Sequence, residues 1–189
     1  MPNLIQTTLT TERLVLRWLT PDDAPDQFSL FSDPAVTRYW STPAWTDMAQ
    51  ARDFVNAALA DYISGEGLRF SIVLRDSGTF VGSVKLYDFF EQNRRCDIGY
   101  ALLPAHWGKG YLAEAMVVLL DYAFSNLDLN RIEADIDPRN TASEKLLDRM
   151  MFQKEGYMRE RWIVNGEVCD TAFYGLLKRD WQARKLTDS

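Results

Sequence analysis

The sequence predicts an α/β (α+β) fold in which a mixed, mostly antiparallel central sheet is flanked by helices. Segments with the two-residue periodicity of strands alternate with segments of helical periodicity along the 189 residues. The last two expected strands are joined by Asn165-Gly166, a pair typical of a tight antiparallel hairpin. No linker or repeat interrupts the chain, so we expect a single domain over residues 1–189 with the order β-α-α-β-β-β-α-β-α-β-β.

The first expected elements are a strand and two helices. Leu14, Leu16 and Trp18 alternate with Arg13, Val15 and Arg17, which indicates a strand with one apolar face. A helix should begin after Thr20-Pro21-Asp22-Asp23, because a threonine cap, a proline and two carboxylates all suit a helix N-terminus. A second helix should start at Thr46 or Asp47 and end at the glycines of residues 65–67.

The rest of the chain should complete the sheet and add two helices. In chain order we expect strands at 69–75, 80–87 and 96–103, a helix over about 111–123, a strand at 131–137, a short helix at about 141–150, and hairpin strands at 152–163 and 168–178.

An aromatic run, Tyr39-Trp40-Ser41-Thr42-Pro43-Ala44-Trp45, lies between the first two helices. One interpretation is a loop that large side chains fold onto the core. The other is a wall of a substrate pocket.

Composition and charge exclude several classes of protein. The net charge of -6 argues against a broad nucleic-acid-binding face and favours cationic partners such as amines. Cys96 and Cys169 have no His or Cys at metal-binding spacing, and the single His106 argues against a Ser-His-Asp triad. There is no apolar run of membrane-spanning length and no signal peptide. We therefore expect a cytoplasmic protein with no metal and no membrane or nucleic-acid partner.

The turn Trp107-Gly108-Lys109-Gly110-Tyr111 has the features of an anion-binding site. Its glycines let the backbone approach a ligand, and the free amides of the following helix favour a phosphate or pyrophosphate. A turn that serves only as a connection is one alternative. A dinucleotide fingerprint, Gly108-x-Gly110-x-x-Ala113, is another, but too few residues follow to complete a doubly wound domain.

Residues 97–104 together with this turn resemble the acetyl-CoA-binding motif of GNAT N-acetyltransferases. Further segments, in the same order along nearly the whole chain, resemble the ribosomal-protein N-acetyltransferase-like branch. They are residues 11–17, 32–37, 130–134, 137–143, 165–166 and 174–177. The resemblance implies the GNAT fold, acetyl-CoA as cosubstrate without a metal, and direct acetyl transfer to an amine.

The resemblance also implies which residues hold acetyl-CoA. Backbone amides of the turn would bind the pyrophosphate, the end of the preceding strand would pair with the pantetheine arm, and one amide there would stabilise the oxyanion. An asparagine at the start of the short helix would hydrogen-bond the cofactor from the far side. The residues implied are Ala101, Leu102, Leu103, Trp107, Gly108, Lys109, Gly110, Tyr111, Leu112 and Asn140.

Two catalytic residues are implied as well. A protonated amine cannot attack, and Asp97 stands where the histone-acetylating branch has a Glu that acts as general base. Because Asp is one methylene shorter than Glu, it would need a water to relay the proton. The alternative is that Asp97 is a solvated or salt-bridged strand residue without a catalytic role. Glu133 is the second candidate base. Ser143 stands where the ribosomal-protein-like branch has a Ser, and it would protonate the departing thiolate unless it is a helix-surface hydroxyl.

Two positions depart from the family pattern. Leu112 replaces the usual Gly or Ala, and Met151 replaces a Gly, so Met151 must adopt a positive φ or the short helix must end differently. We expect an acetyl-CoA-dependent N-acetyltransferase whose acceptor is a protein or peptide N-terminal amine. The alternatives are a small-molecule amine as acceptor, or a non-catalytic CoA-binding regulatory module. The sequence is compatible with either a monomer or a homodimer.

Overall fold

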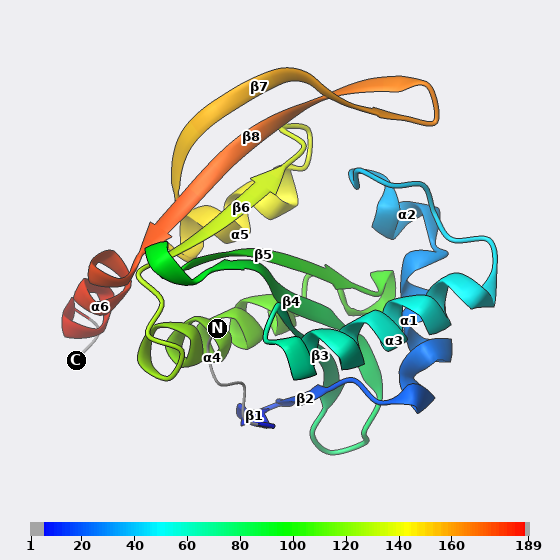
Figure 1. The fold of residues 1–189 in the computed structure, drawn as a ribbon, viewed down its shortest axis with the longest axis horizontal. Helices are drawn as coiled ribbons and strands as arrows, with labels where there is room; N and C mark the ends of the chain where they lie inside the picture. Colours follow the sequence, from blue (N-terminus) through cyan, green and yellow to red (C-terminus); the bar gives the residue numbers. More distant parts are fainter. Residues whose placement is uncertain (1–5, 188–189) are drawn as a thin grey trace.

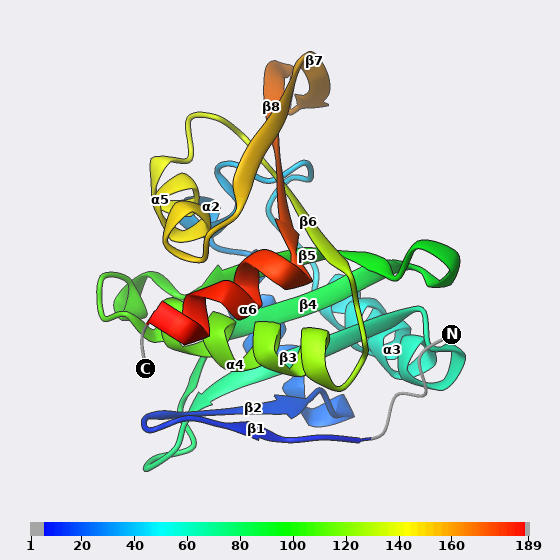
Figure 2. The same cartoon turned by 90° about the vertical axis from the view of Figure 1, so that its left-hand side faces the viewer.

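The computed structural model describes residues 6–187, and their side chains up to residue 184. Within that range eight strands form one sheet in the order β1-β2-β3-β4-β5-β6-β8-β7. All neighbouring strands are antiparallel except the parallel pair β5 and β6. Figure 2 shows α4 and α6 on one face of the sheet and α3 on the other. The predicted mixed, mostly antiparallel sheet flanked by helices is confirmed.

The N-terminal elements follow the expected order with two additions. They are β1 (Leu9–Thr10), β2 (Leu14–Trp18), the 3-10 helix η1 (Pro21–Asp23), α1 (Ala24–Phe31), α2 (Pro34–Thr37) and α3 (Met48–Ser64). Asp47 is the N-cap of α3 and Gly65 its left-handed C-cap with φ 78°. Gly67 does not end this helix, as we had expected, but begins the next strand, because Gly65 alone already reverses the chain.

The expected later elements are present to within about three residues. They are β3 (Gly67–Leu74), β4 (Phe80–Phe90), β5 (Arg95–Leu102), α4 (Tyr111–Ser125), β6 (Arg131–Ile136), α5 (Thr141–Arg149), β7 (Gln153–Val164) and β8 (Glu167–Leu177). Three elements were not expected: the 3-10 helices η2 (Glu91–Asn93) and η3 (Pro104–His106), and α6 (Lys178–Thr187). Met151 follows α5 with φ 67°, so of the two alternatives expected at this position the positive φ is the one found.

The main core lies between the sheet and α4. Met116, Leu119 and Leu120 of this helix are fully buried against apolar side chains of β2 to β6. Trp181 of α6, 1% exposed, joins the same core, and its indole nitrogen donates to Asp121 at 2.7 Å. A smaller core holds α1 and α3 together on the opposite side. A third cluster packs Leu30 and Phe31 of α1 against Phe80 of β4 and Ala101 of β5, so both faces of the strands on which the expected site lies are covered.

The sheet opens between β5 and β6. The two strands pair over only three positions, the last of which is Asp97 opposite Glu133. Beyond that point β6 continues beside β8, and the β7–β8 hairpin extends away from the body (Figures 1 and 2). The remaining residues of β5 pair only with β4. Their other edge therefore faces the opening, where backbone groups are available to a ligand.

Candidate active site

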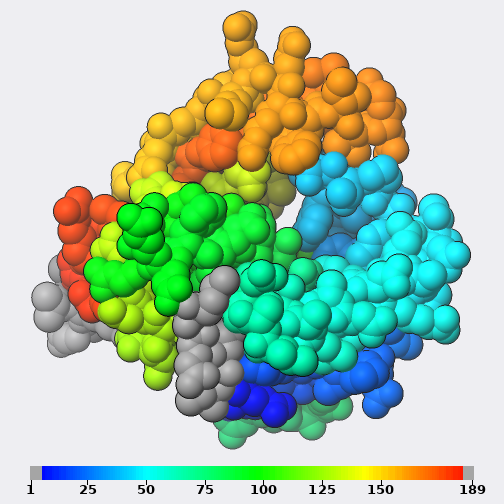
Figure 3. All heavy atoms as spheres, viewed as in Figure 1, coloured from blue at the N-terminus to red at the C-terminus, as the bar shows by residue number. Residues whose placement is uncertain are grey.

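A cavity of about 180 Å³ occupies the opening between β5 and β6. Its walls come from the segment after α2, from β4, β5 and β6, from the start of α5 and from the hairpin strands. Tyr39, Trp40 and Ser41 of the aromatic run line it, and so does Trp162 of β7. Figure 3 shows the hollow between the hairpin, in orange, and the blue and cyan segment around α2 and α3. The aromatic run therefore both lines the cavity and packs onto the core, where Trp40 and Trp45 contact Phe31.

The glycine turn precedes α4 as expected. Gly108 and Gly110 have φ of 72° and 78°, and a Cβ built at Gly108 would meet no heavy atom within 4 Å. Gly110 is the N-cap of α4, and no side chain caps this helix end. The amides of the first turn of α4 are therefore free to bind an anion, as the sequence predicts for this turn.

An arginine immediately before β2 contacts the turn from the protein side. Arg13 donates through one terminal nitrogen to the carbonyl oxygen of Lys109 at 3.0 Å and through Nε to Glu114 at 2.6 Å. Glu114 is the acidic residue in the first turn of α4, and its contact with Arg13 offsets the negative charge there. The helix end stays favourable for an anion. Leu112, the departure from the family pattern, packs against the main core.

The three residues expected to pair with the pantetheine arm differ in what they can offer. The amide of Leu103 donates to Val81 at 3.0 Å, and its carbonyl accepts from His106 at 2.9 Å. The amide of Leu103 is therefore already paired within the protein, whereas its carbonyl oxygen can accept a second hydrogen bond, and the pairing of Leu103 with the cofactor stays a prediction. The carbonyl of Leu102 accepts from the indole of Trp107 at 2.8 Å. Ala101 lies opposite Ser83 of β4.

Asp97 lies at the root of the opening, at the last position where β5 and β6 pair. Its side chain is 28% exposed, Oδ1 has no hydrogen-bond partner among the described residues, and Arg95 approaches only to 3.8 Å. Burial, followed by the charges of Glu133, Asp88 and Asp135, raises the pKa of Asp97 to about 6 against the opposing effect of Arg95. Asp97 does not line the cavity, but Gly99, two residues further on, does. A water would have to link the carboxylate to a bound amine.

Glu133, the second candidate base, is held differently. Arg95 contacts its carboxylate at 2.7 Å and Arg131 at 2.6 Å. Two guanidinium groups thus occupy the carboxylate oxygens of Glu133, which leaves them less available to a substrate amine. Between the two candidates, the surroundings favour Asp97.

Ser143 is buried inside the opening rather than on the surface of α5. It is 7% exposed, and its hydroxyl lies 2.7 Å from the phenol oxygen of Tyr100 on β5. Burial raises the pKa of Tyr100 to about 12, and the bond to Ser143 opposes this rise. Tyr100 was not among the sequence candidates, because a tyrosine in a strand looks like any half-buried residue. The pair supplies a neutral hydroxyl donor at the cavity wall.

Asn140 is the N-cap of α5. Its side-chain oxygen accepts from the amide of Ser143 at 3.1 Å, and the residue also lines the cavity. The amide nitrogen of the side chain is therefore left to donate to a ligand, which is compatible with the expected contact to the cofactor.

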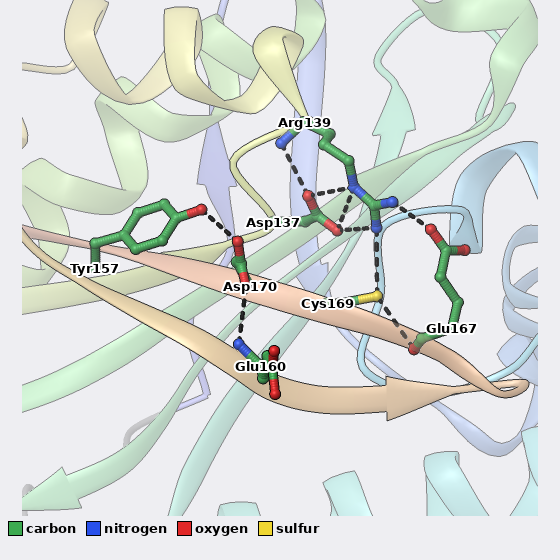
Figure 4. Close-up of polar contacts among 7 residues, drawn as sticks. All are labelled: Asp137, Arg139, Tyr157, Glu160, Glu167, Cys169 and Asp170. Carbon is green, nitrogen blue, oxygen red and sulfur yellow. Dashed lines mark hydrogen bonds and ion pairs between the residues drawn. The ribbon is translucent and has the colours of Figure 1, made fainter.

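An arginine ties the hairpin to the loop before α5. Arg139 binds both carboxylate oxygens of Asp137, contacts Glu167 and reaches the sulfur of Cys169 at 3.3 Å (Figure 4). Burial alone would raise the pKa of Asp137, but these contacts with Arg139 lower it. Within the described residues both cysteines are free. The cluster holds the hairpin over the cavity.

The described residues contain no helix long and apolar enough to cross a membrane. Residues 6–187 also contain no group of three or more His, Cys, Asp and Glu side chains that could hold a metal ion.

The sheet opening, the glycine turn at a helix N-terminus and the carboxylate at the root of the opening fit the class that the sequence resembles, an amine acyltransferase. A family model described as an acetyltransferase (GNAT) domain matches residues 13–153, and the chain belongs to this GNAT family. The predicted family, enzyme class and GNAT fold are confirmed: the protein is an N-acetyltransferase.

Individual relatives agree. The chain is 41% identical over 174 residues to the N-acetyltransferase p20 of Bacillus licheniformis, covering 92% of this chain and 98% of that protein. It is 27% identical over 191 residues to the ribosomal protein uS5-alanine N-acetyltransferase of Escherichia coli (strain K12), covering 95% of each. A GNAT acetyltransferase structure from Bacillus anthracis superimposes with a TM-score of 0.81 at 25% identity, covering 92% of this chain and 99% of that one.

Proposed function

We propose that this N-acetyltransferase transfers the acetyl group of acetyl-CoA to the α-amine of a peptide or protein N-terminus. The observation that carries the proposal is Asp97, a carboxylate with an unpartnered oxygen at the root of the opening and a pKa raised to about 6. A base with this pKa is ionised at neutral pH and still accepts a proton readily.

The glycine turn supports acetyl-CoA as the donor. Uncapped amides at the start of α4 and open space beside Gly108 suit a pyrophosphate, and Lys109 adds a positive charge. The free edge of β5 before Leu103 would pair with the pantetheine arm in the manner of an added strand. Asn140 would donate to the same arm from α5.

The chemistry then needs three proton transfers. The protonated amine loses one proton through a water to Asp97, and the neutral nitrogen forms a bond to the thioester carbonyl carbon. The nitrogen loses its second proton to water as the carbon–sulfur bond breaks. The departing thiolate takes up one proton from the hydroxyl pair of Ser143 and Tyr100, and water returns that proton to the pair.

The acceptor is ranked by the free energy of removing its proton. A peptide α-amine has a pKa near 8, whereas a lysine side chain has a pKa of about 10.4. Asp97 therefore deprotonates an α-amine at a smaller cost. The relative named for acetylating an alanine of ribosomal protein uS5 supports the same choice.

The test is thiol release from acetyl-CoA with a peptide that carries both a free N-terminus and an internal lysine, followed by mass spectrometry. We expect saturable turnover with the acetyl group on the α-amine. Acetyl found only on the lysine would overturn the ranking. Turnover with small amines but not with peptides would assign a small-molecule acceptor, and CoA binding without turnover on any amine would indicate a non-catalytic module.

A further inference from the structure

The charged side chains that line the cavity are paired, with one exception. Asp135 is bound by Arg161 at 2.7 Å, and Asp137 is bound by Arg139. Asp170 accepts from the phenol of Tyr157 and from the backbone amide of Glu160 (Figure 4). Each of these acids thus already has its counter-charge or donor.

Lys85 of β4 is the exception. No described acid lies within ion-pair distance of its ammonium group, and its one close contact is the ring of Tyr87, 3.7 Å from Nζ to the ring centroid. The side chain is half-buried, lines the cavity and packs against Gly99, where a Cβ would lie 2.9 Å from its Cε. Any side chain at position 99 would displace the lysine. The absence of a Cβ there leaves Lys85 lying across the strand next to the cavity.

Other charges near Lys85 do not neutralise it. Arg69, directly opposite on β3, is itself paired with Asp61 of α3 at 3.2 Å. Burial and the charge of Arg69 together lower the pKa of Lys85 to about 8, while the more distant Asp88, Asp135 and Asp61 act in the opposite direction. At pH 7 the cavity therefore contains a charged ammonium group that lacks an anion.

We propose that Lys85 binds a carboxylate of the acetyl acceptor, so that the acceptor carries an acidic group a few bonds from the reacting nitrogen. This inference rests on the proposed function, since it names the acceptor of that same site. A single ammonium suits one carboxylate, whereas phosphate sites gather several donors or an arginine fork.

The strand register is consistent with an acidic group a few bonds from the reacting nitrogen. Lys85 lies opposite Gly99 and Tyr87 lies opposite Asp97, so all four residues share one face of the sheet. Two residues along a strand span about 7 Å. An acceptor whose carboxylate contacts Lys85 thus places its amine within reach of a water on Asp97. The aromatic side chains of Tyr39, Trp40 and Trp162 would cover its apolar part.

The test uses ligands that cannot be acetylated. Binding of 3-phenylpropionate and of 3-phenylpropanamide to the CoA-saturated protein is measured by calorimetry at pH 7. We expect the carboxylate to bind about tenfold more tightly, the factor that one charge-assisted hydrogen bond contributes in a half-buried site. Lys85→Gln should abolish the difference in affinity. If Lys85→Gln does not fold, Lys85→Arg is measured instead, and it should retain the difference because it keeps the positive charge. Lys145→Gln, the same change on the exposed face of α5, is the matched control.

The pH dependence gives a second readout in the wild-type protein. The preference for the carboxylate should fall as the pH rises above about 8, because Lys85 then loses its charge. Equal affinity of both ligands for the wild type, or a preference that survives in Lys85→Gln, would overturn the proposal.

Two dipeptide amides identify the source of the carboxylate. Tighter binding of Ala-Asp amide than of Ala-Asn amide assigns it to a peptide side chain, and discrimination only between the phenyl ligands assigns it to a free amino acid.

The thiol-release assay separates this inference from the proposed function. Turnover without a Lys85-dependent preference for the carboxylate would support the proposed function and contradict this inference. A Lys85-dependent preference without turnover would support the inference and contradict the proposed function.

Discussion

Replacing Asp97 with Asn should make the protein more stable and less active at the same time. The substitution keeps the shape of the side chain and removes the charge at the root of the β5–β6 opening. Asp97 is costly as an anion, because Oδ1 is buried without a hydrogen-bond partner and Glu133 lies opposite on β6. A group kept for function at the expense of stability is expected to behave in this way.

The gain in stability follows from the raised pKa. A rise from the ordinary value of 3.8 to about 6 corresponds to about 3 kcal/mol of unfavourable interaction in the ionised form. The side chain is 28% exposed, so solvent screening reduces the expected gain to about 1–2 kcal/mol. The sign is fixed by linkage: the wild type loses stability as the pH rises from about 4 to about 6, whereas Asp97→Asn does not. Below pH 4 the two proteins should be equally stable.

The loss of activity has its own pH dependence. A general base contributes about 10²- to 10⁴-fold, and we expect a fall of at least 100-fold in kcat/KM at pH 7. Wild-type activity should rise through pH 6 as Asp97 ionises, a limb that the variant lacks. The ratio of the two rates should shrink above pH 8, where a peptide α-amine is already neutral.

The assays are urea unfolding at pH 3.5 and pH 7, and thiol release between pH 5 and pH 9. Asp148→Asn, on the exposed face of α5, controls for the loss of one negative charge. Glu133→Gln should move the acidic limb below pH 6, because it removes a charge that raises the pKa of Asp97 and frees Arg95. A pH–rate profile of Asp97→Asn identical to that of the wild type would remove Asp97 from the mechanism, and an unchanged stability would refute the account of its pKa.

Three further predictions follow from the contacts in and around the site. Gly110→Asp should weaken acetyl-CoA binding by calorimetry at least tenfold, because a carboxylate is added where φ is 78° and an anion must bind; unchanged affinity would mean that the turn is only a connection. Tyr100→Phe and Ser143→Ala should each lower kcat about 10- to 100-fold without changing acetyl-CoA affinity, and the double variant should be no slower if they act as one relay. Asp23→Asn should lower the free energy of unfolding by about 2 kcal/mol, because Asp23 is 2% exposed and binds Arg17 at 2.7 Å; an unshifted urea midpoint would contradict this.

Most of the fold could be predicted from periodicity and turn chemistry. Every expected strand and helix is present because each has an apolar face that local sequence displays, as in β2 and α4. The missed elements lack such a face. β1 has only two residues, and α6 is largely polar, with Trp181 as its buried anchor in the core. Their stability comes from tertiary contacts that no local pattern encodes.

The candidate site was predictable only in part. The glycine turn carries its own signal, because positive φ and a helix N-terminus are local properties. Tyr100, Lys85 and Arg139 carry none, since their roles depend on which side chains the register places beside them. Alternation along β4 and β5 predicts which face each residue occupies, but not that every acid lining the cavity is paired and Lys85 is not.

The short parallel pairing of β5 and β6 accounts for both the open edge of β5 and the position of Asp97. If the strands paired along their whole length, the edge of β5 after Asp97 would be satisfied within the protein and no ligand could add to it. Their separation leaves that edge open and lets water reach Asp97. In our proposal the pantetheine arm satisfies the edge, so bound acetyl-CoA both completes the sheet and encloses the base. The thioester is then held beside the partly desolvated carboxylate, and the raised pKa of Asp97 is a consequence of the same opening that admits the substrate.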